Sequence, residues 1–505
     1  MPYFGLTGGW LTFWVTVACA TDMTLFGYDQ GVFGGVIVTP DFLNTLKLNN
    51  NTSLVGTVTA LYDIGCFFGA IAAFGLGEPL GRKKTILLGT TIMSIGAILQ
   101  ISAFSVAQVI VGRIVAGIGN VINTATAPVW QEETSKAAWR GKLIFIFIFI
   151  LYGTVPWLPE SPRWLIARGR VDEANQILAD LEASDIHDPY VITESKEIQW
   201  AVEYERENSV RWRDLLRGKT GNQGGTCTVR RLVLGMGTQA MQQLSGINVT
   251  SYYLPTVLIE SVGLSNSMAR LLAACNSVSY LLFSLIGIPN VERWGRRKMM
   301  MYAAAGQCFC YLVITVCIRY TELPGYAHKD EIAKASIAFF FLYYVFFGIG
   351  WQGVPWLYPT EVNSLSMRTK GAALGTATNW IFNFMVVEIT PIGIESLAWK
   401  FYIIWTLFNG AFVPVVYFFY PETADRSLED LDRLFRENHD IFVFRDKDAI
   451  HHKRPQKYVE HMEEQVRRNS SINPHDLSEA ARKYRAGVLN KDRDSDEKME
   501  YKADV

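Results

Sequence analysis

Residues 128–141 read PVWQEETSKAAWRG, and residues 355–371 read PWLYPTEVNSLSMRTKG. Both stretches contain Pro and Trp near their start, and in both a glutamate precedes an arginine by seven residues. Because they lie in opposite halves of the chain, the match indicates an internal repeat. The charged residues of the repeat are Glu133, Arg140, Glu361 and Arg368.

Two shorter pairs of motifs repeat in the same order. GRKK at 81–84 corresponds to GRRK at 295–298, and PESPRWL at 159–165 corresponds to PETADRSL at 421–428. Three ordered matches are hard to obtain by chance, and parallel repeats of this kind are typical of transporters built from two helical halves around a central site. The repeat therefore predicts two halves with the same arrangement of helices.

The residues around these motifs are mainly apolar. Half of the 505 residues are hydrophobic and the formal net charge is -1, and uncharged runs of about 20 residues can cross the hydrocarbon layer as helices. Helices also satisfy their own backbone groups in lipid. We therefore predict an all-α polytopic membrane protein with ten or eleven apolar helices. The predicted apolar segments are 10–38, 54–76, 85–104, 106–129, 143–158, 231–259, 269–290, 299–319, 336–358, 371–394 and 398–420.

The distribution of charge predicts four regions. An N-terminal transmembrane half covers 1–158, a cytoplasmic helical linker covers 159–230, a C-terminal transmembrane half covers 231–420, and a charged, largely disordered cytoplasmic tail covers 421–505. Within the linker, DEANQILADL places apolar residues at helical spacing on one face. These residues are Ala174, Ile177, Leu178 and Leu181.

Lysine and arginine in the short loops predict the orientation. By the positive-inside rule, the basic loops and both termini face the cytoplasm. The loop with Asn50 and Asn51 then lies outside, and each of these residues begins an N-glycosylation sequon, although unused sequons are equally compatible with the sequence. The basic loops are GRKK (81–84), WRGK (139–142), ERWGRRK (292–298) and MRTKG (367–371).

The apolar run IFIFIFI at 144–150 stands where the two halves stop matching. Glu133 precedes Glu160 by 27 residues, whereas Glu361 precedes Glu422 by 61. The longer interval holds two apolar segments, and the shorter one holds a single incomplete segment. A single crossing at this point would also turn the later basic loops outward, against the positive-inside rule. We therefore predict that the first half is internally shortened here.

Six stretches of the chain match motifs of one known family. They are FGYDQGVFGG (26–35), GRIVAGIGN (112–120), PVWQEETSKAAWRG (128–141), PESPRWL (159–165), QQLSGINVTSYY (242–253) and PETADRSLEDL (421–431). Together they resemble the sugar porter family of the major facilitator superfamily, and most closely its fungal-type hexose and pentose transporters. The resemblance extends from about Phe26 to Phe435 and implies a fold of twelve spans. Compared with that family, the fifth helix and much of the sixth are absent from this chain.

Asp29 lies in the first apolar segment and Arg113 in the fourth. An ionised carboxylate in hydrocarbon is costly, so we expect Asp29 to face a cavity and an opposite charge, with Arg113 as the candidate partner. The resemblance implies that such a pair acts as a proton switch, in which protonation of Asp29 releases Arg113 and favours sugar binding from outside. A structural ion pair in a facilitative carrier is the alternative.

A binding site for sugars requires uncharged groups that donate and accept hydrogen bonds, together with an aromatic platform. The stretch QQLSGIN supplies Gln242, Gln243 and Asn248 on a span that its glycine loosens. The resemblance implies that these three residues contact the sugar, that Trp356 is the aromatic platform, and that Asn379 is a further amide contact. Helix packing and interhelical hydrogen bonding are the alternative roles.

The charged residues of the basic loops resemble a network that closes the cytoplasmic side of the family's carriers when they face outward. Such contacts are useful only if they break in the other state. The alternative is that these charges only determine topology. The candidate gate residues are Arg82, Glu133, Arg140, Glu292, Arg296, Glu361 and Arg368.

The sequence lacks a phosphate-binding loop, a zinc-ligand cluster and a Ser-His-Asp set. We therefore expect no enzyme activity, no cofactor, no metal and no nucleic-acid partner. The expected function is alternating-access transport of a hexose or pentose across the plasma membrane, with a proton as co-substrate. The alternatives are transport of another polyhydroxylated solute, such as a polyol, inositol, quinate or a disaccharide, and a non-transporting sugar sensor or inactive shortened isoform.

Overall fold

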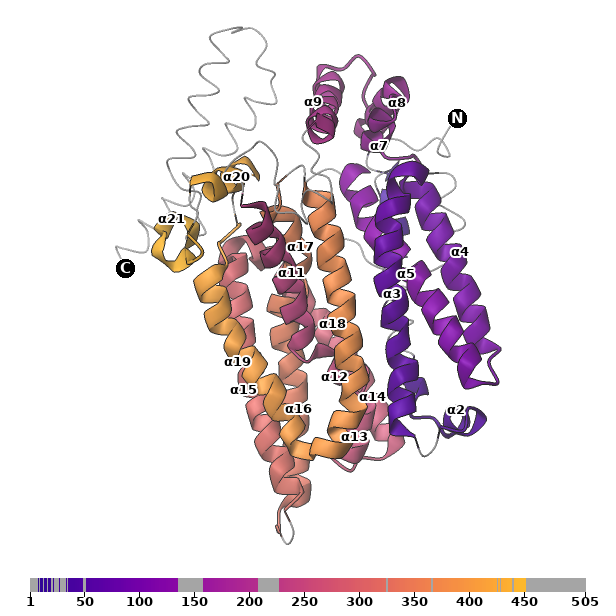
Figure 1. The fold of residues 1–505 in the computed structure, drawn as a ribbon, viewed down its shortest axis with the longest axis vertical. Helices are drawn as coiled ribbons and strands as arrows, with labels where there is room; N and C mark the ends of the chain where they lie inside the picture. The colour runs from indigo at the N-terminus through magenta and orange to yellow at the C-terminus, as the bar shows by residue number, and fades with distance from the viewer. Residues whose placement is uncertain are drawn as a thin grey trace. The chain divides into compact units, whose positions relative to one another are not determined.

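A computed structural model of the chain describes residues 51–134, 158–207, 227–323, 326–364, 367–424, 426, 428–437 and 440–450, preceded by 8, 10, 11, 13–15, 17–19, 21, 27, 33 and 35–48. Throughout these residues the regular secondary structure is helical, as the sequence predicts (Figure 1). Asp29, Asn50 and Arg140 lie outside the described residues, as does 143–157 of the short apolar segment.

The N-terminal half contributes three long helices. Its described elements are α2 (Pro40–Thr45), α3 (Thr52–Leu80), α4 (Arg82–Ile101) and α5 (Val106–Thr134). Helix α5 packs against both α3 and α4 (Figure 1). A Cβ atom on Gly117 of α5 would lie 2.2 Å from the carbonyl oxygen of Tyr62 in α3. Small residues thus allow the backbones to approach closely, which is how apolar helices associate in lipid.

A short helical region follows and confirms the predicted amphipathic face. Its elements are α7 (Pro162–Ala167), α8 (Val171–Glu182) and α9 (Pro189–Glu207). The four apolar residues predicted to share one face of α8 are all buried, at 6% exposure or less. The Ser161 hydroxyl caps α7 by accepting a hydrogen bond from Trp164 N at 3.2 Å. Burial of the apolar face explains why this polar region folds against the ends of the long helices.

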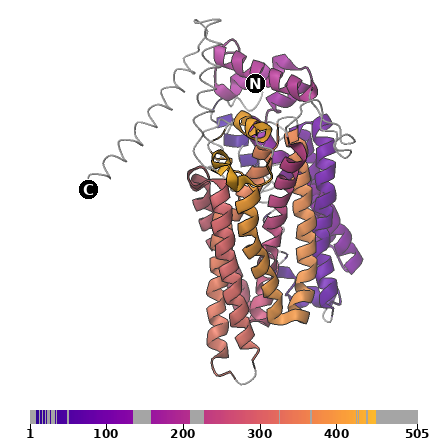
Figure 2. The ribbon, with the colours of Figure 1, turned by 60° about the vertical axis from the view of Figure 1, so that its left-hand side comes forward.

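The C-terminal half consists of long helices interrupted at two places. Its elements are α11 (Thr228–Leu244), α12 (Ile247–Ser251), α13 (Leu254–Glu260), α14 (Asn266–Trp294), α15 (Arg296–Thr321), α16 (Lys329–Phe346), the π-helix η4 (Phe347–Trp351), α17 (Val354–Val362), α18 (Arg368–Leu397), η6 (Ala398–Lys400) and α19 (Phe401–Phe419). Helix α15 packs against α16 and α19 (Figure 2). The chain continues through α20 (Leu428–Glu437), η7 (Val443–Arg445) and α21 (Lys447–Ile450).

The long helices have the length and composition of membrane spans. Seven stretches of the described residues are long and apolar enough to cross a membrane, and the last of them, Lys370–Phe419, covers most of α18 and all of α19. The predicted segment 231–259 is not among them, because it is divided into α11, α12 and α13. The chain is therefore an all-α, multi-pass integral membrane protein.

The internal repeat is present in the backbone. Helices α3 and α14 are each followed by one glycine, Gly81 and Gly295, whose φ angles are +83° and +81°, and α4 and α15 begin at the next residue. This left-handed region favours glycine, because a Cβ atom would be strained there. We call the end of the helices that carries 82–84 and 296–298 the basic end, and the other end, where α3 and α14 begin, the opposite end.

Candidate functional site

A helix break at Gly246, between α11 and α12, is the centre of the candidate site. Gly246 has a φ of +88°, and the break frees backbone carbonyls in an apolar region. Tyr311 Oη donates to Gly246 O at 2.8 Å, while Tyr343 Oη and Asn409 Nδ2 donate to Ser245 O at 3.1 and 2.9 Å. Broken helices persist in membranes when neighbouring side chains satisfy the freed groups, and transporter binding sites are often built at them.

Four of the five predicted sugar-binding residues meet at this break. Gln242 and Gln243 lie on the last turn of α11, Asn248 lies on α12 and Asn379 lies on α18, and each is at most 7% exposed. Asn379 Nδ2 donates to Gln242 Oε1 at 2.8 Å, and Gln243 Nε2 donates to Asn379 Oδ1 at 3.0 Å. Asn248 Nδ2 donates to Gln243 Oε1. The structure thus brings these amides into one hydrogen-bonded cluster.

Two further amides belong to the cluster and were missed from the sequence. Asn379 Nδ2 donates to Gln239 Oε1 at 2.6 Å, and Asn248 Nδ2 donates to Asn383 Oδ1 at 2.6 Å. Each lies four residues from a predicted amide on the same helix, and this spacing places both on one helix face. An amide repeated at that spacing is the signal that could have found them. We call the six residues the amide set: Gln239, Gln242, Gln243, Asn248, Asn379 and Asn383.

Backbone carbonyls from the second interrupted span complete the hydrogen bonding of the amide set. Gln242 Nε2 donates to Trp351 O, and Gln239 Nε2 donates to Pro355 O, both at 2.7 Å. Trp351 is the last residue of η4, and π-helical turns often occur at functional sites because they redirect carbonyl groups. The two irregular spans therefore face each other across the amide set.

Trp356, the predicted aromatic platform, lies apart from these hydrogen bonds. It is on α17, and its side chain is 44% exposed. Among the described residues, its ring makes no aromatic contact. Its role as a platform stays a prediction.

The amide set suits an uncharged ligand with many hydroxyl groups. Each amide offers two donors and one acceptor without net charge, and here most of them bond to other amides. A ligand hydroxyl can replace an amide partner as donor and acceptor at once, so little hydrogen bonding is lost on exchange. An ion or an apolar ligand would leave these buried groups unpaired, which costs free energy.

The N-terminal half reaches the amide set through Asp63, which the sequence did not indicate. Asn383 Nδ2 donates to Asp63 Oδ1 at 3.2 Å, and Asp63 on α3 is fully buried. The carboxyl group interacts electrostatically with Arg113 of α5. Helix α3 therefore brings a titratable group to the edge of the amide set.

Arg113 is buried in the way that a charge-pair partner requires. Its side chain is 1% exposed, and Nη2 donates to Thr59 O at 2.9 Å. Its guanidinium carbon lies 3.7 Å from the ring centre of Phe33 and 4.8 Å from that of Tyr62. Among the residues that the structure describes, Nε and Nη1 have no hydrogen-bond partner. The predicted partner, Asp29, lies outside the described residues.

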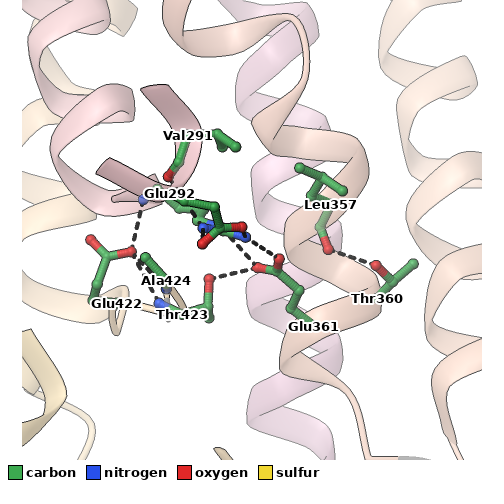
Figure 3. A network of polar contacts seen from close by, with 9 residues as sticks. Val291, Glu292, Leu357, Thr360, Glu361, Glu422, Thr423 and Ala424 are labelled. Atoms are coloured by element: carbon green, nitrogen blue, oxygen red, sulfur yellow. Dashed lines mark hydrogen bonds and ion pairs between the residues drawn. The ribbon is translucent and has the colours of Figure 1, made fainter. Parts of the chain in front are cut away.

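At the basic end, three predicted gate residues form one ion-pair network (Figure 3). Both terminal nitrogens of Arg296 donate to the Glu292 carboxylate at 2.6 Å, and Nη2 also contacts Glu361 Oε1 at 2.6 Å. The Thr423 hydroxyl donates to Glu361 Oε2 at 2.6 Å. Two carboxylates therefore share one almost fully buried guanidinium, which is the strong bidentate form of this pairing.

The basic end also holds a contact that occurs once in each half. Glu160 accepts hydrogen bonds from Arg82 N at 2.9 Å and Lys83 N at 3.3 Å, and Glu422 accepts from Arg296 N at 2.7 Å and from the following residue's N at 3.1 Å. Each carboxylate thus caps the helix that follows its glycine, where the backbone N–H groups and the helix dipole favour negative charge. Burial raises the pKa of Glu160, and hydrogen bonds from the backbone N–H groups of Ser161, Lys83 and Arg82 act in the opposite direction. In the sequence, these two glutamates stand in the repeated motifs PES (159–161) and PET (421–423).

The remaining predicted residues are placed only in part. Glu133 lies in the last turn of α5 and Arg368 begins α18, but their side chains lie outside the described residues. Asn51 is exposed at the start of α3, where its Oδ1 accepts a hydrogen bond from Leu54 N at 3.0 Å. Its glycosylation stays a prediction.

Comparison with known proteins identifies the family. A family model described as "Sugar (and other) transporter" matches residues 14–153 and 143–435. The MFS-type transporter oryC of Aspergillus oryzae is 58% identical over 92% of this chain and 93% of that protein. The sugar transporter STL1 of Saccharomyces cerevisiae is 33% identical over 86% of this chain and 83% of that protein.

Solved structures show the same fold. The chain matches the proton:xylose symporter XylE, from E. coli, with a TM-score of 0.67 and 22% identity, over 84% of this chain and 99% of that one. At this identity the likeness describes the arrangement of helices.

Two features of the comparisons concern the predicted internal shortening of the first half, which stays a prediction. The two family matches meet and overlap at 143–153, beside the run IFIFIFI. The alignment with oryC has 506 positions, whereas 92% of the 505 residues is about 465, so about 40 positions of the relative face a gap in this chain. That length corresponds to one helix and much of a second. With a family match over most of its length and the fold of these carriers, the chain belongs to the sugar porter family of the major facilitator superfamily and is a membrane transporter rather than an enzyme.

Proposed function

We propose that the chain carries a monosaccharide, a hexose or a pentose, across the plasma membrane by alternating access. The observation that carries this proposal is the buried amide set at the break between α11 and α12. Its six side chains are at most 7% exposed and uncharged, and they provide donors and acceptors in the proportion that sugar hydroxyls require. Gln242, Gln243, Asn248 and Asn379 bind the sugar, and Trp356 stacks against its apolar face.

We propose proton symport as the driving reaction, with Asp29 as the proton-binding group and Arg113 as its partner. Support comes from Arg113, a buried cation with two nitrogens that lack hydrogen-bond partners among the described residues. A carboxylate beside these nitrogens would satisfy them, and protonation of the carboxylate would release them. A facilitative carrier with a structural pair is the competing possibility.

The network at the basic end is proposed as the cytoplasmic gate. Arg296 with Glu292 and Glu361 forms its C-terminal part. The matching residues of the first half are proposed to complete it when the carrier faces outward, and their separation would open the cytoplasmic side. The residues assigned to this completion are Arg82, Glu133, Arg140 and Arg368.

The basic end and both termini are proposed to face the cytoplasm. Lys and Arg concentrate in the loops at this end, as the positive-inside rule requires. Asn50 and Asn51 then lie outside. Replacing both by Gln should remove an endoglycosidase-sensitive mass shift in a eukaryotic host, whereas a shift that persists in the double variant would argue against these acceptor sites.

Uptake of labelled glucose or xylose in a host that lacks its own hexose carriers tests the proposal. Surface localisation is checked in the same cells, and uptake is measured with and without an imposed inward proton gradient. Saturable uptake is expected, with accumulation only under the gradient. A correctly localised chain without uptake would overturn the transport assignment, and uptake that ignores the gradient would overturn symport alone.

A second candidate is transport of another polyhydroxylated solute. The amide set favours this possibility because it recognises hydroxyl groups and carries no feature specific to one ring. Competition of the labelled sugar with unlabelled polyol, inositol, quinate or disaccharide separates the two candidates. The stronger competitor at equal concentration identifies the solute class.

The predicted shortening of the first half favours a third candidate, a non-transporting sugar sensor or inactive isoform. The alignment with oryC is about 40 positions longer than the part of this chain that it covers, which supports the shortening, and a carrier needs both halves to alternate. If uptake is absent, deletion of residues after about 440 and measurement of sugar-dependent gene expression would distinguish a sensor from an inactive chain. Loss of the response on deletion indicates signalling.

A further inference from the structure

Asp63 is a second buried carboxyl group at the junction of the two halves. It lies on α3 and is fully buried, and its Oδ1 accepts one hydrogen bond, from Asn383 Nδ2 at 3.2 Å. Among the described residues, Oδ2 has no hydrogen-bond partner. We propose that Asp63 binds and releases a proton during the transport cycle and that its contact with Asn383 is a proton-dependent latch between α3 and α18. This proposal rests on the proposed transport function and adds to it a coupling residue in the second predicted span.

Among the described residues, charged and titratable groups around Asp63 come from α5 and from the segment between α12 and α13, with a further carboxyl group on α18. Arg113 comes from α5, and its charge acts on the Asp63 carboxyl group. Tyr253, between α12 and α13, has a hydroxyl that interacts with Asp63, Arg113 and Glu388 of α18, and it donates to Val387 O at 3.2 Å. Helix α4 carries its charged residues only in its first turn, at the basic end. Asp29, which the family resemblance also places beside Arg113, lies outside the described residues.

The contacts of Asp63 lie where the halves touch. Among the described residues, two hydrogen bonds join α3 to α18: the one from Asn383 to Asp63, and the one from the Thr57 hydroxyl to Glu388 Oε1 at 2.7 Å. The Cβ position of Gly56 also lies 3.2 Å from Pro391 Cγ. These contacts extend from Asp63 towards the opposite end, which we propose to face outside. Alternating access requires α3 and α18 to separate along this line.

The environment of Asp63 differs between the two states of such a cycle. With the halves together, the described residues give the carboxyl group one N–H donor and one cation within range, and an ionised group without further donors is costly there. With the halves apart, water can hydrate the ionised form. A proton taken from the outer solution forms an O–H bond at Oδ2, so the halves can close over a neutral group, and the proton leaves to the inner solution in the following state.

The same step acts directly on the sugar site. Asn383 donates to Asp63 and accepts from Asn248 Nδ2, and Asn248 in turn donates to Gln243. A change in protonation at Asp63 therefore alters the hydrogen bonds of the amide set without any group in between. Proton binding and sugar binding are coupled through one amide.

Hydrogen–deuterium exchange on the full-length protein in lipid nanodiscs tests the latch without requiring transport. Wild type and Asp63→Asn are compared at pH 5 and at pH 7.5, so intrinsic exchange rates cancel at each pH. We expect slower exchange in peptides from the opposite halves of α3 and α18 for Asp63→Asn at pH 7.5, and no difference at pH 5. Equal exchange at both pH values, or a difference that does not change with pH, would overturn the proposal.

Two further variants make the result specific. Asp41→Asn removes an exposed carboxylate of α2 at the same end and should behave as wild type. The double variant Asp63→Asn/Asn383→Asp exchanges the two side chains and keeps one carboxyl group and one amide at the contact. It should restore the pH dependence of hydrogen–deuterium exchange. Failure of the double variant to restore it, with normal folding of both proteins, would also count against the latch.

Uptake measurements on the same variants separate this proposal from the proposed function. If wild type accumulates sugar under a proton gradient, Asp63→Asn should retain sugar exchange and lose accumulation, and unchanged accumulation would overturn the latch alone. If wild type transports nothing while the exchange data show the expected pH dependence, the transport assignment fails and the latch stands.

Discussion

At the scale of single residues, the protein concentrates uncharged polar groups where lipid-embedded chains usually avoid them. Asn379 contacts Gln239, Gln242 and Gln243 at the same time. No other residue of the amide set has three amide partners among the described contacts. Removing it would therefore leave several buried donors and acceptors unsatisfied, which costs more than the loss of one hydrogen bond.

Asn379→Ala should destabilise the folded protein, and in the protein that still folds it should weaken sugar binding, because a sugar hydroxyl would lose its amide partner. A lost hydrogen bond that leaves a buried group unsatisfied in the complex costs about 1–3 kcal/mol, and this corresponds to an increase in Kd of roughly 5- to 150-fold. Titration of the purified protein with the transported sugar measures the change. Asn266→Ala, at the exposed start of α14, is the matched control and should leave Kd unchanged. A Kd within twofold of wild type for Asn379→Ala would contradict the assignment.

Glu160 should make stability depend on pH. Burial raises its pKa in the folded protein above the ordinary value of 4.5, so the folded state holds this proton more tightly than the unfolded state does. The corresponding stability is complete below the unfolded pKa and is lost as the pH rises through the raised folded pKa. Thermal unfolding of wild type and Glu160→Gln is measured at about pH 4 and about pH 7. The stability of wild type relative to Glu160→Gln should be lower at about pH 7 than at about pH 4.

The control for this experiment is Glu203→Gln, which replaces an exposed glutamate of α9. The difference in thermal stability between Glu203→Gln and wild type should be the same at both pH values. The interpretation of Glu160 is wrong if Glu160→Gln and Glu203→Gln show the same pH response.

At the scale of elements, each half joins two long helices through a glycine and holds the second helix with a distant carboxylate. Gly81 and Gly295 have positive φ angles, and a Cβ atom on them would lie 2.7 Å from Glu160 Oε2 and 2.4 Å from Glu422 Oε2. Backbone strain and contact with the capping carboxylate therefore act together at both positions. The linker and the tail are attached to the basic end by the same kind of contact.

Gly81→Ala and Gly295→Ala should each destabilise the protein, by about 1–2 kcal/mol or more, because a positive φ angle is unfavourable for alanine. The displaced carboxylate adds to the effect. Thermal or denaturant unfolding in detergent measures it. Gly75→Ala, inside α3 with no atom within 4 Å of its Cβ position, is the control and should be neutral or stabilising. Equal stability of all three variants would show that the glycine joints are not constrained.

At the scale of the whole molecule, the two halves are unequal. Among the described residues, the irregular spans, the amide set and the ion-pair network of Arg296 lie in the second half, and the first half is predicted to be shortened at 143–153, where the two family matches overlap. A carrier that alternates between two states needs both halves to move as rigid bodies around the site. The predicted loss of one helix and much of another would remove part of one wall of the carrier.

Insertion of the missing segment should therefore restore or strongly increase transport. The corresponding 40 or so residues of the oryC relative, placed between 142 and 150, would provide the absent helix length. Uptake per molecule at the cell surface should then rise by at least an order of magnitude over the natural chain, because the closed first half regains its packing. An insertion of equal length with shuffled apolar residues is the control, and equal uptake by both insertions would refute a specific role for the segment.

Several features could be predicted from the sequence because they depend on local pattern or on motifs. Apolar length predicted the helices, charge in the loops matched the basic end, and the motif QQLSGIN located Gln242, Gln243 and Asn248. The internal repeat located Gly81 and Gly295 in equivalent positions. In each case the residues that carry the information are close together in the chain or belong to a family motif.

The partners of these residues could not be predicted in the same way. Asp63 and Asn383 are 320 residues apart, and Glu160 lies 78 residues from Arg82. The spacing of residues along one helix does not reveal which face of another helix those residues contact, because the contact depends on how the long helices pack. The PES and PET motifs were recognised as a repeat, but their capping contacts were not.

The sequence by itself determined that this chain is an all-α, multi-pass member of the sugar porter family, because apolar length and ordered motifs are properties of the chain alone, and it predicts that the first half is shortened. Only the tertiary structure decided which polar groups meet inside it. Burial in an apolar medium forces each of them to find a partner, and the packing of α3 and α18 against the broken helix α11–α12 selects those partners: the amides for one another, and Asp63 for Asn383.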